Sequence, residues 1–196
     1  MAGTLRATDG RSMRRGWRAL ALFVVALSPS LFAPARLAAE QAGLAQQGGQ
    51  PVGPVSGLPI PRYVSLKSDR VNLREGPSKE HRTSWVFLRA GLPVEITAEF
   101  DVWRKVRDSE GSEGWVLHSL LSGRRTGLVT PWKKAPEARV YDSPGGHGAT
   151  VAALQPNVIA NVKSCDGEWC RVWGDGFKGY VAQRDLWGVY PGEKFE

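Results

Sequence analysis

The sequence has 196 residues and a formal net charge of +7, and this length allows one ordinary domain or two small ones. Residues 1–39 contain six arginines and one aspartate, so they carry a net charge of +5 and leave about +2 for the other residues. The basic character therefore belongs to the N-terminal segment. The rest of the sequence has no clear basic patch, which argues against binding to nucleic acid.

The N-terminal segment has the layout of a secretory signal peptide. Basic residues precede an apolar run over 19–33, and small residues follow it, which places candidate cleavage sites after Ala35 or Ala39. Pro29 interrupts the run, which is shorter than the roughly 20 residues that cross a bilayer. We therefore expect residues 1–39 to be a signal peptide and the exported chain to have no stable membrane span. An uncleaved N-terminal anchor is the alternative.

Residues 40–61 are rich in Gly, Pro, Gln and Ala and have few bulky side chains, a composition typical of a flexible tether. From residue 62 onward the sequence repeats itself at a spacing of 66, because 92–106 aligns with 158–172 without a gap. Two flanking blocks match with a register shift of one residue: 71–78 with 138–145, and 114–121 with 179–186. An internal repeat predicts two copies of one structural unit, at 62–124 and 130–190.

Each unit is predicted to consist of short β-strands. Over 92–100, apolar residues alternate with mostly polar ones, which is the period of a half-buried strand. Turn residues recur at short intervals, and no segment after residue 62 has a long apolar period of 3.6 residues. Small units of short strands favour a closed barrel, because closure removes exposed sheet edges.

The first unit contains "VNLREGPS", then "DVWRKV" and "GWV", and it resembles the bacterial SH3-like (SH3b) domain. The second unit departs from the pattern at "RVYDSPGG" and at Tyr180, which replaces Trp115. The whole chain is similar to the exported two-copy SH3-like proteins of Gram-negative alphaproteobacteria. This resemblance implies an all-β fold of two tandem SH3-like barrels in the periplasm, with a role in binding peptidoglycan or its peptides.

The sequence contains no recognisable catalytic or metal-binding constellation. Its three histidines, His81, His118 and His147, stand apart, and His118 aligns with Gln183 of the second unit. No nucleophile elbow, metalloprotease helix or phosphate-binding loop is present. Two cysteines and distant histidines do not make a convincing zinc-ligand set. We therefore predict a non-catalytic protein without a metal or another cofactor.

The two cysteines lie in "SCDGEWCRVW", on either side of an Asp-Gly turn signal. In an exported protein, Cys165 and Cys170 are expected to form a disulfide across a hairpin; free thiols and a metal site are the alternatives. They align with Glu99 and Arg104, which we expect to face each other as an exposed ion pair. Strict alternation would place the two cysteines on opposite faces, so the hairpin requires a bulge or a strong twist.

Aromatic residues are the candidate ligand-binding residues. Trp103 and Trp169 occupy equivalent positions after the hairpin turn, and Trp115 corresponds to Tyr180. The resemblance implies that the first of these positions can line a peptide-binding surface, whereas packing in the core is the alternative. The tryptophans outside the repeat are candidates for the contact between the domains: Trp85, Trp132, Trp173 and Trp187.

Two functions therefore follow from the sequence. The first is a cell-envelope module that binds peptidoglycan or its peptides through an aromatic groove. The second is a protein-interaction adaptor that positions or regulates an envelope enzyme. The partner is accordingly a cell-wall peptide, peptidoglycan or an envelope protein.

Overall fold

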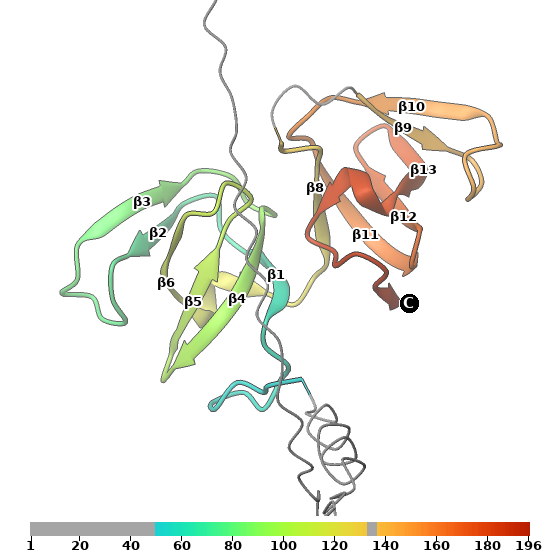
Figure 1. The fold of residues 1–196 in the computed structure, drawn as a ribbon. Coiled ribbons are helices and arrows are strands. Elements are labelled where there is room, and N and C mark those ends of the chain that lie inside the picture. The colour runs from blue at the N-terminus through green and yellow to red at the C-terminus, as the bar shows by residue number, and fades with distance from the viewer. Residues whose placement is uncertain (1–49, 133–136) are drawn as a thin grey trace, which may run out of the picture. The chain divides into compact units, whose positions relative to one another are not determined.

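The computed structural model describes residues 50–132 and 137–196 (Figure 1). The predicted signal peptide, 1–39, and the first part of the predicted tether, 40–49, lie outside these ranges. Within the described part of the chain, no helix is long and apolar enough to cross a membrane. Apart from two short 3-10 helices, the described residues form strands, turns and loops.

The first domain is an antiparallel sheet that curves around its own core (Figure 1). Along this sheet the strands follow the order β3-β2-β6-β5-β4-β1-β7. The strands are short because turn residues interrupt the chain at close intervals. Their bounds are β1 (Arg62–Leu66), β2 (Val71–Arg74), β3 (Thr83–Phe87), β4 (Pro93–Phe100), β5 (Trp103–Arg107), β6 (Glu113–Leu117) and β7 (Leu121–Ser122), with the 3-10 helix η1 (His118–Leu120) before β7.

The second domain repeats this arrangement strand for strand, in the order β10-β9-β13-β12-β11-β8-β14. The predicted all-β fold of two tandem units is therefore confirmed. One further strand, β15, pairs with β11, and the sheet spans 126–195, a wider range than the predicted 130–190. The bounds are β8 (Thr126–Val129), β9 (Ala138–Tyr141), β10 (Thr150–Leu154), β11 (Ile159–Asp166), β12 (Trp169–Gly174), β13 (Phe177–Ala182), η2 (Gln183–Asp185), β14 (Leu186–Trp187) and β15 (Lys194–Phe195).

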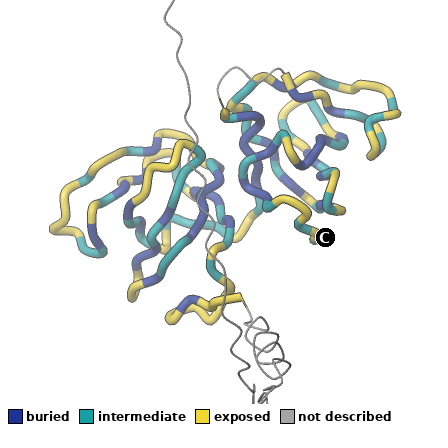
Figure 2. The backbone as a smooth tube through the Cα atoms, viewed as in Figure 1, coloured by how far each residue is buried: buried dark blue, intermediate teal, exposed yellow. Residues whose placement is uncertain are grey.

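Each sheet encloses a hydrophobic cluster of its own, and buried residues alternate with exposed ones along the strands (Figure 2). Burying an aliphatic side chain contributes about 1.5–3 kcal/mol. The first cluster consists of Leu66, Val71, Leu73, Phe87, Val94, Ile96, Val106 and Val116. The second is built around Val129, Val140, Leu154, Val162, Val172, Val181 and the two cysteines.

A β-bulge in β4 changes the face that its last residues occupy. The alternation over 92–100 predicts that Phe100 faces the core with Ile96, yet Phe100 is 58% exposed and Glu99 is buried. The register of β4 against β5 shifts between Ile96 and Ala98. One extra residue reverses the faces beyond it, so the alternation gave the wrong face for Phe100.

Cys165 and Cys170 form a disulfide in the second domain, as predicted from their turn and alignment. They are paired directly across the β11–β12 hairpin, with Cα atoms 4.1 Å apart. The register shifts between Val162 and Ser164, which is the position equivalent to the bulge in β4. Because of this bulge both cysteines are buried, and the expected departure from strict alternation is confirmed.

Removing the disulfide should destabilise the second domain and leave the first unchanged. For the double variant Cys165→Ala, Cys170→Ala, we expect a loss of about 2 kcal/mol of unfolding free energy, the value for a bridge that closes so short a loop. A urea titration followed through amide NMR signals of both domains measures this loss. The signals of the first domain are the internal control. Two free thiols in the denatured, unreduced protein would contradict the disulfide between Cys165 and Cys170.

Residues 50–61, the second part of the predicted tether, pack against the end of the β4–β5 hairpin. Val52 pairs with Pro59 in a small antiparallel bridge. Inside the turn between them, Ser56 donates two hydrogen bonds to the Glu99 carboxylate, from its hydroxyl at 2.7 Å and its backbone N–H at 2.8 Å. The composition of the segment did not predict this contact.

The pairing of Glu99 with Arg104 across the first hairpin is present, but it is buried rather than exposed. The two residues are opposed in register, and Arg104 Nε lies 3.4 Å from Glu99 Oε1. Arg62 donates a second charged hydrogen bond at 2.8 Å, and the Glu99 side chain has no exposed area. The segment 50–61 accounts for this burial because it covers the carboxylate.

Of the four tryptophans expected at the contact between the domains, Trp187 packs there against a ring of the first domain. Its ring centroid is 5.2 Å from that of Tyr63, which also lies 4.6 Å from the ring of Tyr190. The Tyr190 hydroxyl donates a hydrogen bond of 2.9 Å to Glu95 of the first domain. The expectation is wrong for Trp85 and Trp173, which are exposed. Trp132 is 46% exposed, but it lines a hollow together with Tyr63 of the first domain and Trp187.

Candidate functional site

Each domain carries a groove at the same place on its sheet, beside the repeat tryptophan. In the first domain the groove has a volume of about 210 Å³, and we name it the Trp103 groove. Its lining residues are Arg70, Asn72, Arg74, Lys79, Trp103, Leu117 and Leu120. In the second domain the groove has a volume of about 570 Å³, and we name it the Trp169 groove. Its lining residues are Glu137, Arg139, Tyr141, Ala153, Trp169, Ala182, Arg184 and Asp185.

The difference in size follows from residues on the strand that pairs with the tryptophan. Trp103 pairs with Leu117, whereas Trp169 pairs with the smaller Ala182. Trp103 is only 6% exposed, and its groove is correspondingly shallow. Trp169 is partly exposed, because a methyl group leaves room where an isobutyl group would cover the ring. The second groove is therefore the better candidate for a ligand.

The turn before β12 and the loop after β9 hold Trp169 in place. Asp166 Oδ1 accepts hydrogen bonds from the backbone N–H of Trp169, at 2.7 Å, and of Glu168, at 2.9 Å. The Tyr141 ring meets the indole edge to face, with centroids 5.7 Å apart. Gly146 lies close to the same indole, because a methyl carbon added there would be 3.1 Å from it. The ring is therefore fixed before any ligand binds.

The two grooves differ in charge. The Trp103 groove is lined by three cationic side chains and no carboxylate, so it suits an anionic group. The Trp169 groove has both signs, with Arg139 and Arg184 set among Glu137 and Asp185. Burial raises the pKa of Asp185, and the neighbouring Arg184 lowers it in part. A mixed groove of this kind suits an extended peptide that carries both amino and carboxylate groups.

A second hollow adjoins the Trp169 groove. It has a volume of about 630 Å³ and shares Trp169, Ala182 and Arg184 with the groove. We name it the aromatic trench, because three further rings line it: Tyr63, Trp132 and Trp187. Trp169 thus lines both the charged groove and the aromatic trench, a position from which a single ring can contact a long ligand on both sides.

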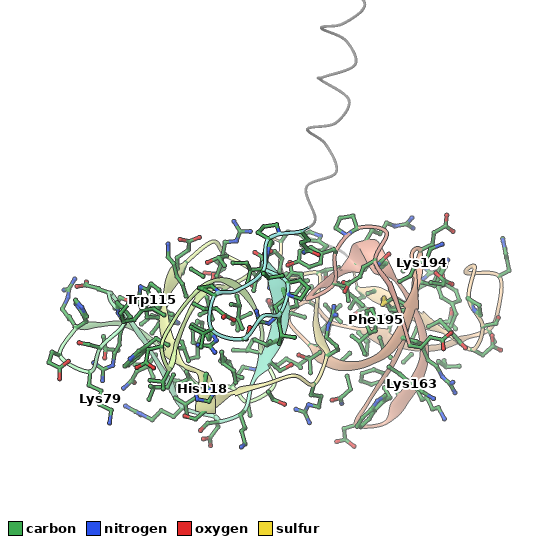
Figure 3. The ribbon with its side chains drawn as sticks, turned by 90° about the horizontal axis from the view of Figure 1, so that it is seen from below. Lys79, Trp115, His118, Lys163, Lys194 and Phe195 are labelled. Carbon is green, nitrogen blue, oxygen red and sulfur yellow. A yellow bond between two sulfur atoms is a disulfide. The ribbon has the colours of Figure 1, made fainter. Side chains whose placement is uncertain are left out.

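The other predicted aromatics are placed differently. Tyr180 pairs with Tyr141 and lines, together with Trp169, a shallow hollow of about 530 Å³ beside the disulfide. Trp115 pairs with Arg74 and Lys105 but does not line the Trp103 groove. Its side chain lies on the first domain, as Figure 3 shows. The structure therefore places Trp169 and Tyr180 in one hollow, whereas Trp115 is outside the Trp103 groove.

The described residues contain no cluster of three or more His, Cys, Asp and Glu side chains that could hold a metal ion. His81, His118 and His147 are exposed. His118 lies in the first domain at the start of η1 (Figure 3).

The comparison with protein families decides what kind of domain carries these grooves. The family model for the bacterial SH3 domain matches the chain twice, over residues 67–123 and 134–188. The chain belongs to the bacterial SH3 domain family. Both matches contain the strands β2 to β6 or their equivalents β9 to β13, so both grooves lie on bacterial SH3 domains. No curated protein matches the chain.

Three solved structures are similar to this bacterial SH3 protein. NlpC2 and NlpC1 from Trichomonas vaginalis are 17% and 18% identical to it, over 65% and 69% of the chain, each with a TM-score of 0.30. An NlpC/P60 family protein from Bacillus cereus ATCC 10987 is 16% identical over 63% of the chain, with a TM-score of 0.29. The matched parts cover 48%, 48% and 55% of these structures, so the chain spans about half of their length.

Several groove residues of these bacterial SH3 domains were missed from the sequence. They are the charged residues Arg70, Arg74, Arg139 and Arg184, with Tyr141 beside them. One feature of the sequence could have pointed to Tyr141 as a groove residue: it aligns with an arginine, Arg74, of the first repeat. No feature of the sequence pointed to the arginines as groove residues, because alternation in a strand does not distinguish a groove from any other exposed face.

Proposed function

We propose that this protein is an exported binding protein of the cell envelope, located in the periplasm, and that its bacterial SH3 domains recognise peptidoglycan or its stem peptides. Bacterial SH3 domains are typically binding domains, which supports a non-catalytic role. The main support for this proposal is the partly exposed Trp169, which is held in a groove that has two arginines and two carboxylates. Peptides of the cell wall present both carboxylates and amines, which such a groove can pair.

The mechanism rests on fixed groups rather than on a chemical step. The indole of Trp169 supplies a flat apolar surface, and the guanidinium groups of Arg139 and Arg184 can bind carboxylates through paired N–H donors. Because Asp166 fixes the backbone of Trp169 and Tyr141 packs against its ring, little side-chain entropy is lost on binding. If the Trp103 groove engages the same polymer, the tandem arrangement adds avidity.

Sedimentation with purified sacculi tests this function. We expect the purified protein to co-sediment at low salt and Trp169→Ala to lose at least about tenfold in apparent affinity, as for a central aromatic contact. Trp85→Ala is the matched control, because Trp85 is 60% exposed on β3 and lines neither groove. Arg184→Ala, at an exposed position, is a second variant that should fold normally. Equal sedimentation of all four proteins would overturn the assignment of the groove.

A second function is favoured by the aromatic trench. A hollow of about 630 Å³ with three rings in addition to Trp169 fits an apolar side chain of a protein partner. Under this reading the protein is an adaptor for an envelope enzyme. Crosslinking in intact cells from a photoreactive residue at position 132 would then capture one specific protein, whereas bare sacculi would not retain the purified chain.

A further inference from the structure

A cationic hollow with aromatic walls lies on β11, β12 and β13 and shares no lining residue with the Trp169 groove or the aromatic trench. Its volume is about 400 Å³, and we name it the Trp173 hollow. The lining residues are Lys163, Arg171, Val172, Trp173, Gly174, Phe177 and Lys178. Trp173 is 49% exposed, and Lys163 lies at the surface of the second domain (Figure 3).

The three cations of this hollow have no carboxylate partner among the residues that the structure describes. Lys163, Arg171 and Lys178 take part in none of its ion pairs. Asp175 lies in the turn between β12 and β13, and Glu196 lines the neighbouring hollow together with Arg171. Neither acid lines the Trp173 hollow, so the hollow carries an uncompensated positive charge.

The equivalent face of the first domain is neutralised by carboxylates. Arg107 forms an ion pair with Glu95, its neighbour in register on β4. Lys105 forms an ion pair of 2.6 Å with Glu113, which stands opposite Arg107 on β6. Each cation on this face therefore has an acidic neighbour across the strands.

In the second domain the same register positions carry different residues. Trp173 takes the place of Arg107, and Lys178 stands opposite it, where the first domain has Glu113. Arg171 therefore meets a like charge where Lys105 meets an opposite one. Arg171 and Lys178 are diagonal neighbours across β12 and β13, within reach of long side chains, and the first domain builds the same sheet with opposite charges at these positions. The fold therefore does not require the uncompensated cations of the Trp173 hollow, which leaves them free to bind an anionic group.

We propose that the Trp173 hollow binds an acidic glycan. A sugar ring packs its apolar C–H face against the Trp173 indole, and its carboxylate or phosphate group accepts charge-assisted hydrogen bonds from Lys163, Arg171 and Lys178. The concave shape suits a discrete ring with its charged substituent.

A membrane surface and a nucleic acid fit the hollow less well. Docking of the β12–β13 turn on a membrane would bring the exposed Asp175 to the anionic headgroups together with Trp173. A nucleic-acid surface needs a longer basic track than three side chains, and the same face of the first domain has its cations paired. The site is also independent of the proposed function, because none of its residues line the Trp169 groove.

An NMR titration of the full chain with tetragalacturonate and with its methyl ester tests the site. The two probes share their rings, but only the first carries carboxylates. We expect tetragalacturonate to shift the Trp173 indole and the Lys178 amide saturably, and the ester to bind at least about tenfold more weakly. Lys178→Glu should weaken binding of tetragalacturonate about tenfold, the value of one charged hydrogen bond. Trp173→Ala should weaken it similarly.

Lys178→Glu also restores the charge pattern of the first domain, so its melting temperature should not fall. Lys67→Glu makes the same charge change at an exposed position of the first domain and is expected to bind like the unaltered protein. Equal effects of the two lysine variants, equal binding of acid and ester, or no shift with millimolar tetragalacturonate would each overturn the proposal. Phosphatidylglycerol vesicles that shift Trp173 when the oligosaccharide does not would assign the hollow to a membrane instead.

Discussion

Glu99→Gln is expected to lower the unfolding free energy of the first domain by about 3–5 kcal/mol, the usual effect of removing one member of a buried ion pair. The carboxylate has no exposed area and serves two arginines, Arg62 and Arg104. It also accepts hydrogen bonds from the backbone of Val55 and from the backbone and hydroxyl of Ser56. The neutral amide would leave two guanidinium groups without a counter-charge and would weaken the hydrogen bonds that hold the segment 50–61.

The effect of this substitution should depend on pH in a defined direction. Burial by itself raises the pKa of Glu99, but the hydrogen bonds from Ser56, Arg62 and Val55 outweigh it and lower the pKa to about 2. A carboxylate with a lowered pKa contributes stability above its unfolded pKa of about 4.3, and the contribution disappears as the pH falls toward 2. The difference in stability between the protein and Glu99→Gln should therefore be full at pH 6 and shrink below about pH 4.

Denaturant unfolding read through amide signals of the first domain measures the effect, because the two domains need not unfold together. Glu113→Gln is the matched control. It removes a carboxylate from an ion pair with Lys105 that is exposed to solvent, so we expect a loss of less than about 1 kcal/mol. A Glu99 variant that resembles the Glu113 variant, or one whose effect is the same at pH 3 and pH 6, would show that the buried cluster contributes little.

The Glu99 cluster also shows where sequence reasoning succeeded and where it stopped. The repeat aligned Glu99 and Arg104 with the two cysteines, and the structure opposes both pairs across equivalent hairpins. The burial of Glu99 could not be predicted, because Val55 and Ser56, which bind its carboxylate, lie more than forty residues away in a segment whose composition resembles that of a tether. Periodicity reports neighbours along a strand, whereas this contact joins two segments that share no pattern.

The candidate site, too, was predicted from the sequence only in part. The repeat located Trp103 and Trp169, because their equivalence is visible in an alignment without gaps. It did not reveal that Ala182 in place of Leu117 opens one groove and not the other, since this is a difference in packing between two apolar residues. Trp173 was assigned to the contact between the domains, yet it is exposed in a hollow of its own. The sequence did not show that Trp173 pairs with Lys178 across β12 and β13 and lines the same hollow.

Gly179→Ala is expected to destabilise the second domain by about 3 kcal/mol, at the upper end of the range for overpacking. In both domains a glycine starts the "GYV" or "GWV" block, and β13 and β9 approach closely at Gly179. A methyl carbon there would lie 2.3 Å from the backbone oxygen of Tyr141 and 2.7 Å from Val140. Because the obstacle is backbone, the strand itself must move, and Tyr141 moves with it in the Trp169 groove.

The substitution should therefore weaken ligand binding in the second domain as well as its stability. Gly123→Ala is the control, because nothing lies within 4 Å of the added methyl and its backbone is unstrained; we expect it to be neutral or slightly stabilising. Gly114→Ala tests the repeat, since its added methyl would lie 2.6 Å from Leu73 and 2.8 Å from the Arg74 carbonyl oxygen. If unfolding measured for each domain shows that Gly114→Ala destabilises only the first domain and Gly179→Ala only the second, the two glycines have equivalent packing roles. An unchanged Tyr141 NMR signal in Gly179→Ala would contradict the expected effect on the Trp169 groove.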